Sequence, residues 1–237
     1  MSREVLNLKQ AAEHVHLEEN ELKHFAQRGE IEAMKRGDEW FFEHRTLDEW
    51  AQRNLLAASE RELKEQHRVM MDEHRRANKS GWAVTDFFSV DAIDLAVQAK
   101  AKAGILRDMT DLAVRGGKVY DEEGLFKELQ DREDVASTAI GEGVALLHPR
   151  FHDPYLFEES FIAYGRSVRP IFFGAADGEA TRHFFLIAST DHELHLHILA
   201  RLAILAHGTD LMARLDAAET PEAVIAAVRD CEEAYRR

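Results

Sequence analysis

The residues with the clearest potential for chemistry lie between Arg132 and Arg150, in the stretch REDVASTAIGEGVALLHPR. A Gly-x-Gly turn leads there into the apolar run Val144 to Leu147, and His148 follows at once. In open α/β sheets, ligands bind outside the carboxyl ends of the strands, so His148 is well placed to react. A histidine in this position can also be an ordinary loop residue, and the strand pattern alone leaves both interpretations open.

Two further histidines lie at the start of a long helix predicted from Asp191 to about His207. Thr190 followed by Glu193 predicts a capping box, which places His192 and His195 in the first turns of this helix. Exposed amide groups and the helix dipole attract anions there, and the same field disfavours the imidazolium form. A neutral imidazole beside an anion site suits phosphoryl transfer to nitrogen.

The motifs around these histidines resemble the enzyme IIA domain of the fructose, mannitol and nitrogen type, from the bacterial phosphoenolpyruvate-dependent phosphotransferase system. The resemblance covers residues 84–237. It is carried by Arg132-Glu133, the run STAIGEG from Ser137 to Gly143, the run VALLH that ends at His148, and the run HLHILARL from His195 to Leu202.

The resemblance implies that His148 is the phosphorylated histidine and that His195 orients it. Arg132 and Thr138 would help to hold the phosphoryl group, and the guanidinium fork of arginine matches phosphate geometry. It also implies a histidine phosphocarrier protein as donor, an enzyme IIB or a regulatory target as acceptor, and no cofactor. Leu147 precedes His148 where the family usually has proline, and this departure predicts either a different direction of the His148 ring or altered docking of a partner.

A metal site is a competing interpretation, because His192, His195 and His197 lie together with neighbouring carboxylates. On a helix, however, His192 and His195 are about 60° apart, and His197 points about 140° away from His192. Only two of them could converge on one ion, so no metal ligands are predicted. Five other histidines are expected on the surface, namely His14, His16, His24, His67 and His74.

The rest of residues 84–237 alternates between helical and strand patterns. Helices are predicted from Ile105 to Ala113, before Gly116-Gly117, and again from Asp121. Buried strands are predicted at Val144–Leu147, Ile171–Phe173 and Phe184–Ile187, with Phe172, Phe173, Phe184 and Phe185 in the sheet core. This alternation indicates an α/β domain, a mixed sheet flanked by helices.

Residues 1–58 show a different pattern of helix, helix, hairpin and helix. Asn7 with Gln10 predicts the first helix start, and a second helix from Glu18 to Arg28 should stop at Gly29. Residues 31–35 and 40–42 predict a hairpin, and Thr46 with Glu49 predicts a capping box for the third helix. This order is typical of a winged helix-turn-helix.

The same segment resembles the excisionase and MerR-type DNA-binding family in the AA of the first helix, RGEI, the K-x-G-x-x-W wing and L-D-x-W. The resemblance implies that the second helix enters the major groove. The DNA contacts would come from Glu19, Asn20, Lys23 and His24, with Lys35 and Arg36 on the wing. Three glutamates at the start of that helix would repel phosphates, so protein docking or dimerisation remains the alternative.

Composition limits the function classes. The net charge is −14, residues 1–58 carry 8 basic and 12 acidic side chains, and no segment has a strong excess of positive charge. Cys231 is the only cysteine, which excludes a disulfide framework. The polar start MSREVLNLKQ and the absence of a long apolar run favour a soluble, cytoplasmic protein.

Residues 59–83 are predicted to form a helical connector, with a short connecting helix or a coiled-coil seam as alternatives. Two function classes follow. In one, the chain is a regulator whose helix-turn-helix segment responds to the state of His148. In the other, it is a phosphocarrier for a sugar transporter, and the N-terminal segment serves docking or dimerisation.

Overall fold

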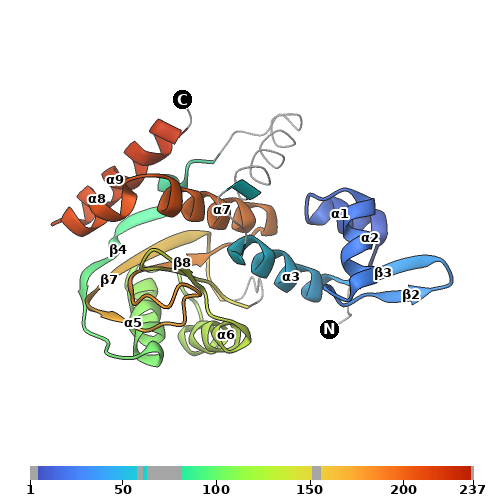
Figure 1. Cartoon of the computed structure of the whole chain (residues 1–237). Helices are drawn as coiled ribbons and strands as arrows, with labels where there is room; N and C mark the ends of the chain where they lie inside the picture. Colours follow the sequence, from blue (N-terminus) through green and yellow to red (C-terminus); the bar gives the residue numbers. More distant parts are fainter. Residues whose placement is uncertain (1–4, 58–60, 63–81, 151–155, 236–237) are drawn as a thin grey trace.

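The computed structural model describes residues 5–57, 61–62, 82–150 and 156–235 (Figure 1). The predicted connector, residues 59–83, lies almost entirely outside these ranges, as do His67 and His74. The N-terminal region contains β1 (Val5–Asn7), α1 (Leu8–His14), α2 (Glu19–Arg28), β2 (Met34–Arg36), β3 (Glu39–Glu43) and α3 (His44–Ala57). Its three strands form a small antiparallel sheet in the order β1-β3-β2.

Local signals set the boundaries of the first two helices as predicted. The Asn7 side chain accepts a hydrogen bond from the Gln10 amide, and the Gln10 side chain accepts one from the Asn7 amide, so the capping box is present. Helix α2 ends at Gly29, whose φ of 71° is left-handed and favours glycine. The helix, helix, hairpin, helix order of this region is confirmed.

The predicted cap of the third helix is wrong. Helix α3 begins at His44, directly after β3, so Thr46 lies inside its first turn. His44 and Asp48 are one turn apart, and His44 Nδ1 lies 3.2 Å from a carboxylate oxygen of Asp48. The strand therefore continues into the helix without a linker.

The C-terminal domain has a mixed five-stranded sheet in the order β4-β7-β8-β6-β5. Its strands are β4 (Phe88–Val97), β5 (Ala139–Gly141), β6 (Val144–Leu147), β7 (Phe161–Ile171) and β8 (Thr181–Ala188). Its helices are the short 3₁₀ helix η1 (Val84–Phe87), α5 (Lys102–Arg115), α6 (Glu122–Val135), α7 (His192–Gly208), α8 (Leu211–Ala217) and α9 (Pro221–Tyr235). The β4–β7 and β6–β8 pairs are parallel, and the β7–β8 and β5–β6 pairs are antiparallel.

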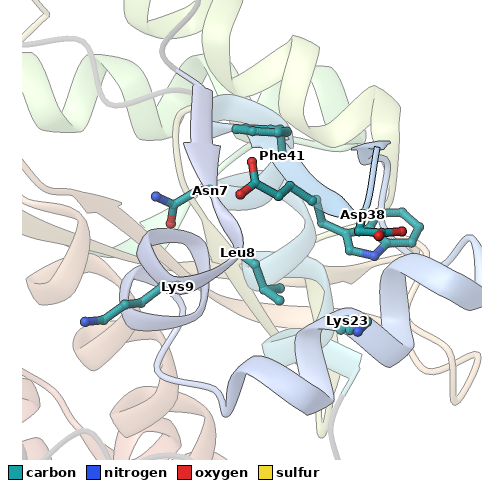
Figure 2. A pocket seen from close by; sticks show the side chains of 8 residues that line it. Asn7, Leu8, Lys9, Lys23, Asp38 and Phe41 are labelled. Atoms are coloured by element: carbon teal, nitrogen blue, oxygen red, sulfur yellow. The ribbon is translucent and has the colours of Figure 1, made fainter. Parts of the chain in front are cut away.

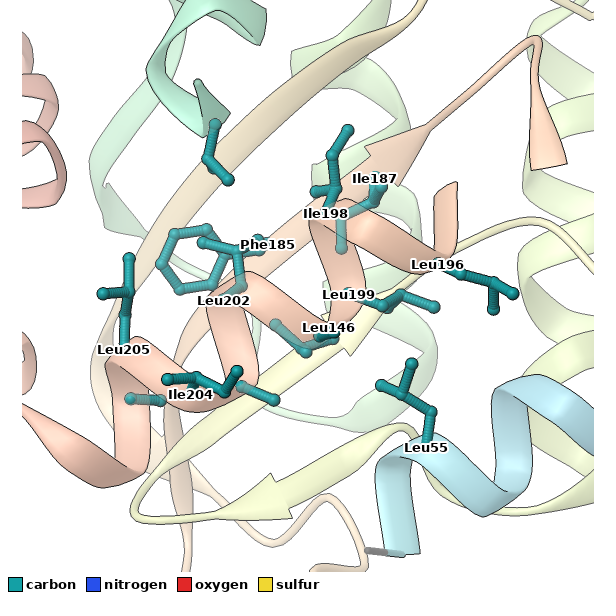
Figure 3. Close-up of a cluster of buried hydrophobic side chains, with 14 of the residues drawn as sticks. Leu55, Leu146, Phe185, Ile187, Leu196, Ile198, Leu199, Leu202, Ile204 and Leu205 are labelled. Carbon is teal, nitrogen blue, oxygen red and sulfur yellow. The ribbon is translucent and has the colours of Figure 1, made fainter. Parts of the chain in front are cut away.

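Helices cover both faces of this sheet (Figure 1). Helices α5 and α6 pack on one face through a cluster that includes Met109, Leu125 and Phe184. Helices α7 and α9 pack on the other face, and this second cluster continues into α3 of the N-terminal region. Figure 3 shows Leu55 of α3 facing α7, close to Leu196 and Leu199. The predicted α/β class is confirmed, and the two parts of the chain share one apolar core.

Two strand-level predictions need correction. The strand expected at Ile171–Phe173 is the end of the longer β7, and Phe172 is 81% exposed because it follows the last strand residue. Phe173, Phe184 and Phe185 are buried as predicted.

Within the described residues, no single helix is long and apolar enough to cross a membrane, and α7 with α8 reaches that composition only as a pair bent by 86°.

One buried polar pair in the sheet gives a pH-dependent contribution to stability. Tyr164 on β7 and His183 on β8 are both buried, and the Tyr164 hydroxyl lies 2.8 Å from His183 Nδ1. Burial lowers the pKa of His183 to about 4, although the Asp216 carboxylate opposes the shift. A histidine with a depressed pKa favours folding only while it is neutral, since the unfolded chain binds the proton more readily.

We therefore expect the contribution of His183 to the free energy of unfolding to be lost as the pH falls from about 6.5 to about 4. A shift of this size corresponds to about 3 kcal/mol in the free energy of unfolding. Urea denaturation of wild type and His183→Gln at several pH values measures the difference between them. An identical pH dependence in the two proteins would show that His183 does not titrate in this way.

Candidate functional site

His148 lies directly after β6, and a short hydrogen-bond network fixes its ring. Its side chain is fully buried. Nδ1 is 2.8 Å from the Leu146 carbonyl oxygen, which can only accept, so Nδ1 carries the proton. Arg132 Nε donates to Nε2 across 3.0 Å, which requires a lone pair on Nε2. The ring is therefore held as a neutral imidazole, and Nε2 is its nucleophilic nitrogen.

The leucine that precedes His148 is part of the sheet. Leu147 is the last residue of β6, it pairs with Leu186 of β8, and its side chain is buried. The strand thus continues up to the histidine, and the Nδ1 hydrogen bond to the Leu146 carbonyl oxygen sets the direction of the ring. The substitution for proline leaves Nε2 directed toward Arg132.

Arg132 lies near the end of α6 and is almost completely buried. Besides His148, it donates from Nη1 to the Ala136 carbonyl oxygen at 2.9 Å. Burial lowers the pKa of Arg132, and the carboxylates of Glu133 and Glu49 oppose this effect. Arginine stays protonated under ordinary conditions, so Arg132 is a buried cation beside Nε2.

His195 approaches His148 from α7. The two rings meet edge to face, with their centroids 5.1 Å apart, and His195 is fully buried. The predicted capping box before it is wrong, because Asp191 and not Thr190 caps α7, accepting from the Leu194 amide at 2.8 Å. The amide of Thr190 donates to Ser160 instead. His195 still lies in the first turns of the helix, as predicted.

Thr138 is close in sequence to these residues but has a different partner. Its hydroxyl donates to a Glu133 carboxylate oxygen at 2.6 Å, and its amide donates to the same oxygen at 3.0 Å. The other Glu133 oxygen accepts from Lys102 at 2.7 Å. Thr138 therefore fixes the turn before β5. Glu133 and Lys102 form a supporting layer for which sequence reasoning assigned no role.

The N-terminal region contributes to the surroundings of the site. Glu49 of α3 pairs with Arg150, two residues after His148, at 2.6 Å. Glu49 and Arg53 also lie close enough to Arg132 to influence its pKa. The N-terminal segment thus packs beside the active-site face. Arg68, Arg75, Arg76 and Lys79, the basic residues of the predicted connector, lie outside the described residues.

The residues with predicted DNA contacts lie on α2 and β2 of the N-terminal region. His24, Lys35 and Arg36 are exposed, and Lys23 is half-buried. Figure 2 shows Lys23 at a pocket of about 370 Å³ between α1, α2 and the β2–β3 hairpin, with Asp38 and Phe41 on the hairpin side. Lys9, Asp38 and Glu39 give this pocket mixed charge. All of its lining residues come from the N-terminal region, so the pocket is separate from the site of His148 and His195.

Comparisons with known proteins agree with this geometry. The family described as "Phosphoenolpyruvate-dependent sugar phosphotransferase system, EIIA 2" matches residues 86–231. A nitrogen regulatory protein of Bradyrhizobium diazoefficiens is 31% identical over 145 residues, which are 60% of this chain and 91% of that protein. A fructose-specific EIIABC component of Bacillus subtilis is 28% identical over 144 residues, and this chain spans only 22% of its length.

Solved structures show the same fold. The nitrogen regulatory protein IIA-Ntr from Neisseria meningitidis superposes with a TM-score of 0.55 at 23% identity, covering 61% of this chain and 98% of that one. IIA mannitol from Escherichia coli gives a TM-score of 0.53 at 20% identity, covering 60% and 98%. Both align with only about three fifths of the chain. Since the family match covers more than half of its residues, this chain belongs to the EIIA 2 family of the phosphoenolpyruvate-dependent sugar phosphotransferase system.

Proposed function

We propose that this protein is a regulatory EIIA protein in which His148 accepts a phosphoryl group and the N-terminal region responds to it. The observation that carries the proposal is the contact of α3 with the site. Glu49 pairs with Arg150, and α3 shares a core with α7, the helix that bears His195. A phosphocarrier domain that acted alone would need no such contact beside its histidine.

The chemistry proposed for His148 uses the groups around Nε2. The Nε2 lone pair attacks the phosphorus of a phosphohistidine on a histidine phosphocarrier protein. A new P–N bond forms, the donor P–N bond breaks, and the donor imidazole keeps its electron pair. Arg132 Nε, which now donates to Nε2, would turn to a phosphoryl oxygen, and His195 would donate to another.

The burial of the two histidines implies that the site must open before a donor protein can reach His148. His148 and His195 are both fully buried, and a donor protein must bring its phosphorus within about 3–3.5 Å of Nε2. Phosphorylation also places about two negative charges near the Glu49 carboxylate. The two anions would compete for Arg132 and Arg150, so phosphorylation would favour release of α3. The acceptor of the signal would be an enzyme IIB, another protein or DNA.

Replacement of the two histidines tests the assignment of roles. His148→Ala should accept no phosphate from a phosphorylated histidine phosphocarrier protein. His195→Ala should still be labelled, but about 10²–10³ times more slowly, because a transition-state donor is lost. Rapid-quench labelling with ³²P measures both, and His207→Gln at the far end of α7 is the matched control. Full labelling of His148→Ala would refute the assignment.

Loosening α3 from α7 tests the opening step. Leu55 is buried against α7, so Leu55→Asp should disfavour the closed arrangement, because an unpaired carboxylate is costly to bury. If opening limits access to His148, labelling should accelerate about tenfold or more. Asn54→Asp adds the same charge at the neighbouring, half-buried position and serves as the control. Equal labelling rates in all three proteins would argue against a cover that controls access.

The hairpin cations supply the test for DNA as the regulatory target. Lys35 and Arg36 are exposed on β2, and their cationic groups lie 5.8 and 5.5 Å from the ring centroids of Trp40 and Phe41. If they contact phosphates, Lys35→Gln with Arg36→Gln should reduce the slope of log Kd against log salt by about 2. Arg229→Gln on α9 is the control. Equal, weak binding by all proteins would favour protein docking or dimerisation as the role of this region.

A further inference from the structure

A cluster of histidines surrounds one buried carboxylate where the N-terminal region meets α7. Asp48 of α3 is only 6% exposed. His14 Nε2 lies 2.6 Å from Asp48 Oδ1, and His44 Nδ1 lies 3.2 Å from Oδ2. His192, the first residue of α7, places Nδ1 3.1 Å from Oδ1. The cluster lies outside the groups that hold His148, and His14 is half-buried rather than on the surface as predicted.

We infer that His14, His44 and Asp48 form a binding site for a divalent transition-metal ion such as Zn²⁺. Their ligand atoms all lie within 4.8 Å of one another. Zinc binds imidazole nitrogen and carboxylate oxygen at about 2.0–2.2 Å, so two ligands of one ion are at most about 4.4 Å apart. Small side-chain rotations would bring the three groups to that spacing. Zinc sites with three protein ligands keep a fourth position for water or another ligand.

The arrangement of the rings supports a shared ion at the carboxylate. Three imidazoles surround Asp48, and the His14 and His192 rings stack with centroids 4.1 Å apart and an interplanar angle of 15°. Zinc binds the neutral form of imidazole, so an ion at this site would take one ring nitrogen from His14 and one from His44.

Both oxygens of the carboxylate face imidazole nitrogens. His14 and His192 approach Oδ1 of Asp48, and His44 approaches Oδ2. The nearly buried carboxylate is therefore already held among the groups that would share an ion with it.

The ligand types indicate the class of ion. Imidazole suits zinc, cobalt, nickel and copper, whereas magnesium and calcium prefer sets made of oxygen ligands. His44 and Asp48 are four residues apart on one helix, a spacing that directs both to the same side. His192 would act as a positioning residue, because its Nδ1 lies 3.1 Å from Asp48 Oδ1 and its ring stacks on that of His14. The bound ion would join α1 to α3 beside the start of α7.

The test uses the full-length chain without an affinity tag, stripped of metal with a chelator. Isothermal titration with ZnCl₂ should give one ion per chain. At 100 times the Kd, the melting temperature should rise by about 5–10 °C. Co²⁺ should give the visible absorption bands of a site with nitrogen and oxygen ligands. Asp48→Asn and His14→Gln should each weaken zinc binding at least about tenfold.

Two further variants keep the test decisive. His44→Gln removes a ligand that is 32% exposed and leaves the Asp48–His14 pair, so it should fold normally and still lose affinity for zinc. His24→Gln on α2 removes an exposed histidine and should bind zinc as wild type does. Absence of zinc binding by folded wild type, or wild-type affinity in folded His44→Gln, would overturn the inference. Phosphorylation of His148 is not needed for any of these measurements.

Discussion

Helix α7 has apolar residues around its whole circumference, and this constraint organises the molecule. A helix that is hydrophobic on all sides must be buried on all sides. The sheet covers one side of α7 through β8, and α9 covers another. Helix α3 of the N-terminal region packs on it as well, with Leu55 facing Leu196 and Leu199 (Figure 3). The burial of α7 therefore ties the N-terminal region to the EIIA domain.

This packing brings charged groups of α3 to the histidines. Glu49 reaches Arg150, and it also contributes to the electrostatic environment of Arg132. Asp48, one residue earlier, lies against His192 at the start of α7. Adjacent residues of α3 thus contact the two segments that carry His148 and His195. Any change in the charge of the site acts on α3 over contact distances, where screening by salt is weak.

Local signals in the sequence predicted the elements that depend on local interactions. The Asn7–Gln10 capping box and the stop at Gly29 involve neighbouring residues, so α1 and α2 were placed correctly. The motif around His148 likewise predicted the strand, the arginine and the histidine on α7. The cap of α7 was misplaced because Thr190 and Asp191 are both good capping residues, and Ser160, which engages Thr190, is 30 residues away.

The rest depended on contacts between distant residues. The Glu49–Arg150 pair spans 101 residues, and no periodicity or cap signals it. Strand β4 was not predicted, because its partner β7 lies more than sixty residues later and its burial follows no simple alternation. The sequence shows His44 and Asp48 as an i, i+4 pair. It does not show that His14 of α1 and His192 of α7 approach the same carboxylate.

The electrostatics of the site follow from these long-range contacts. Arg132 is a buried cation whose compensation comes partly from Glu133 in its own domain and partly from Glu49 of the N-terminal region. A phosphoryl group on Nε2 would supply the same compensation from a shorter distance, so the Glu49 carboxylate would no longer be needed and would be repelled. Glu133 would stay in place, because Lys102 and Thr138 hold it. The contact that phosphorylation would weaken is therefore the one between the two parts of the chain, while the supporting layer of the EIIA site is preserved.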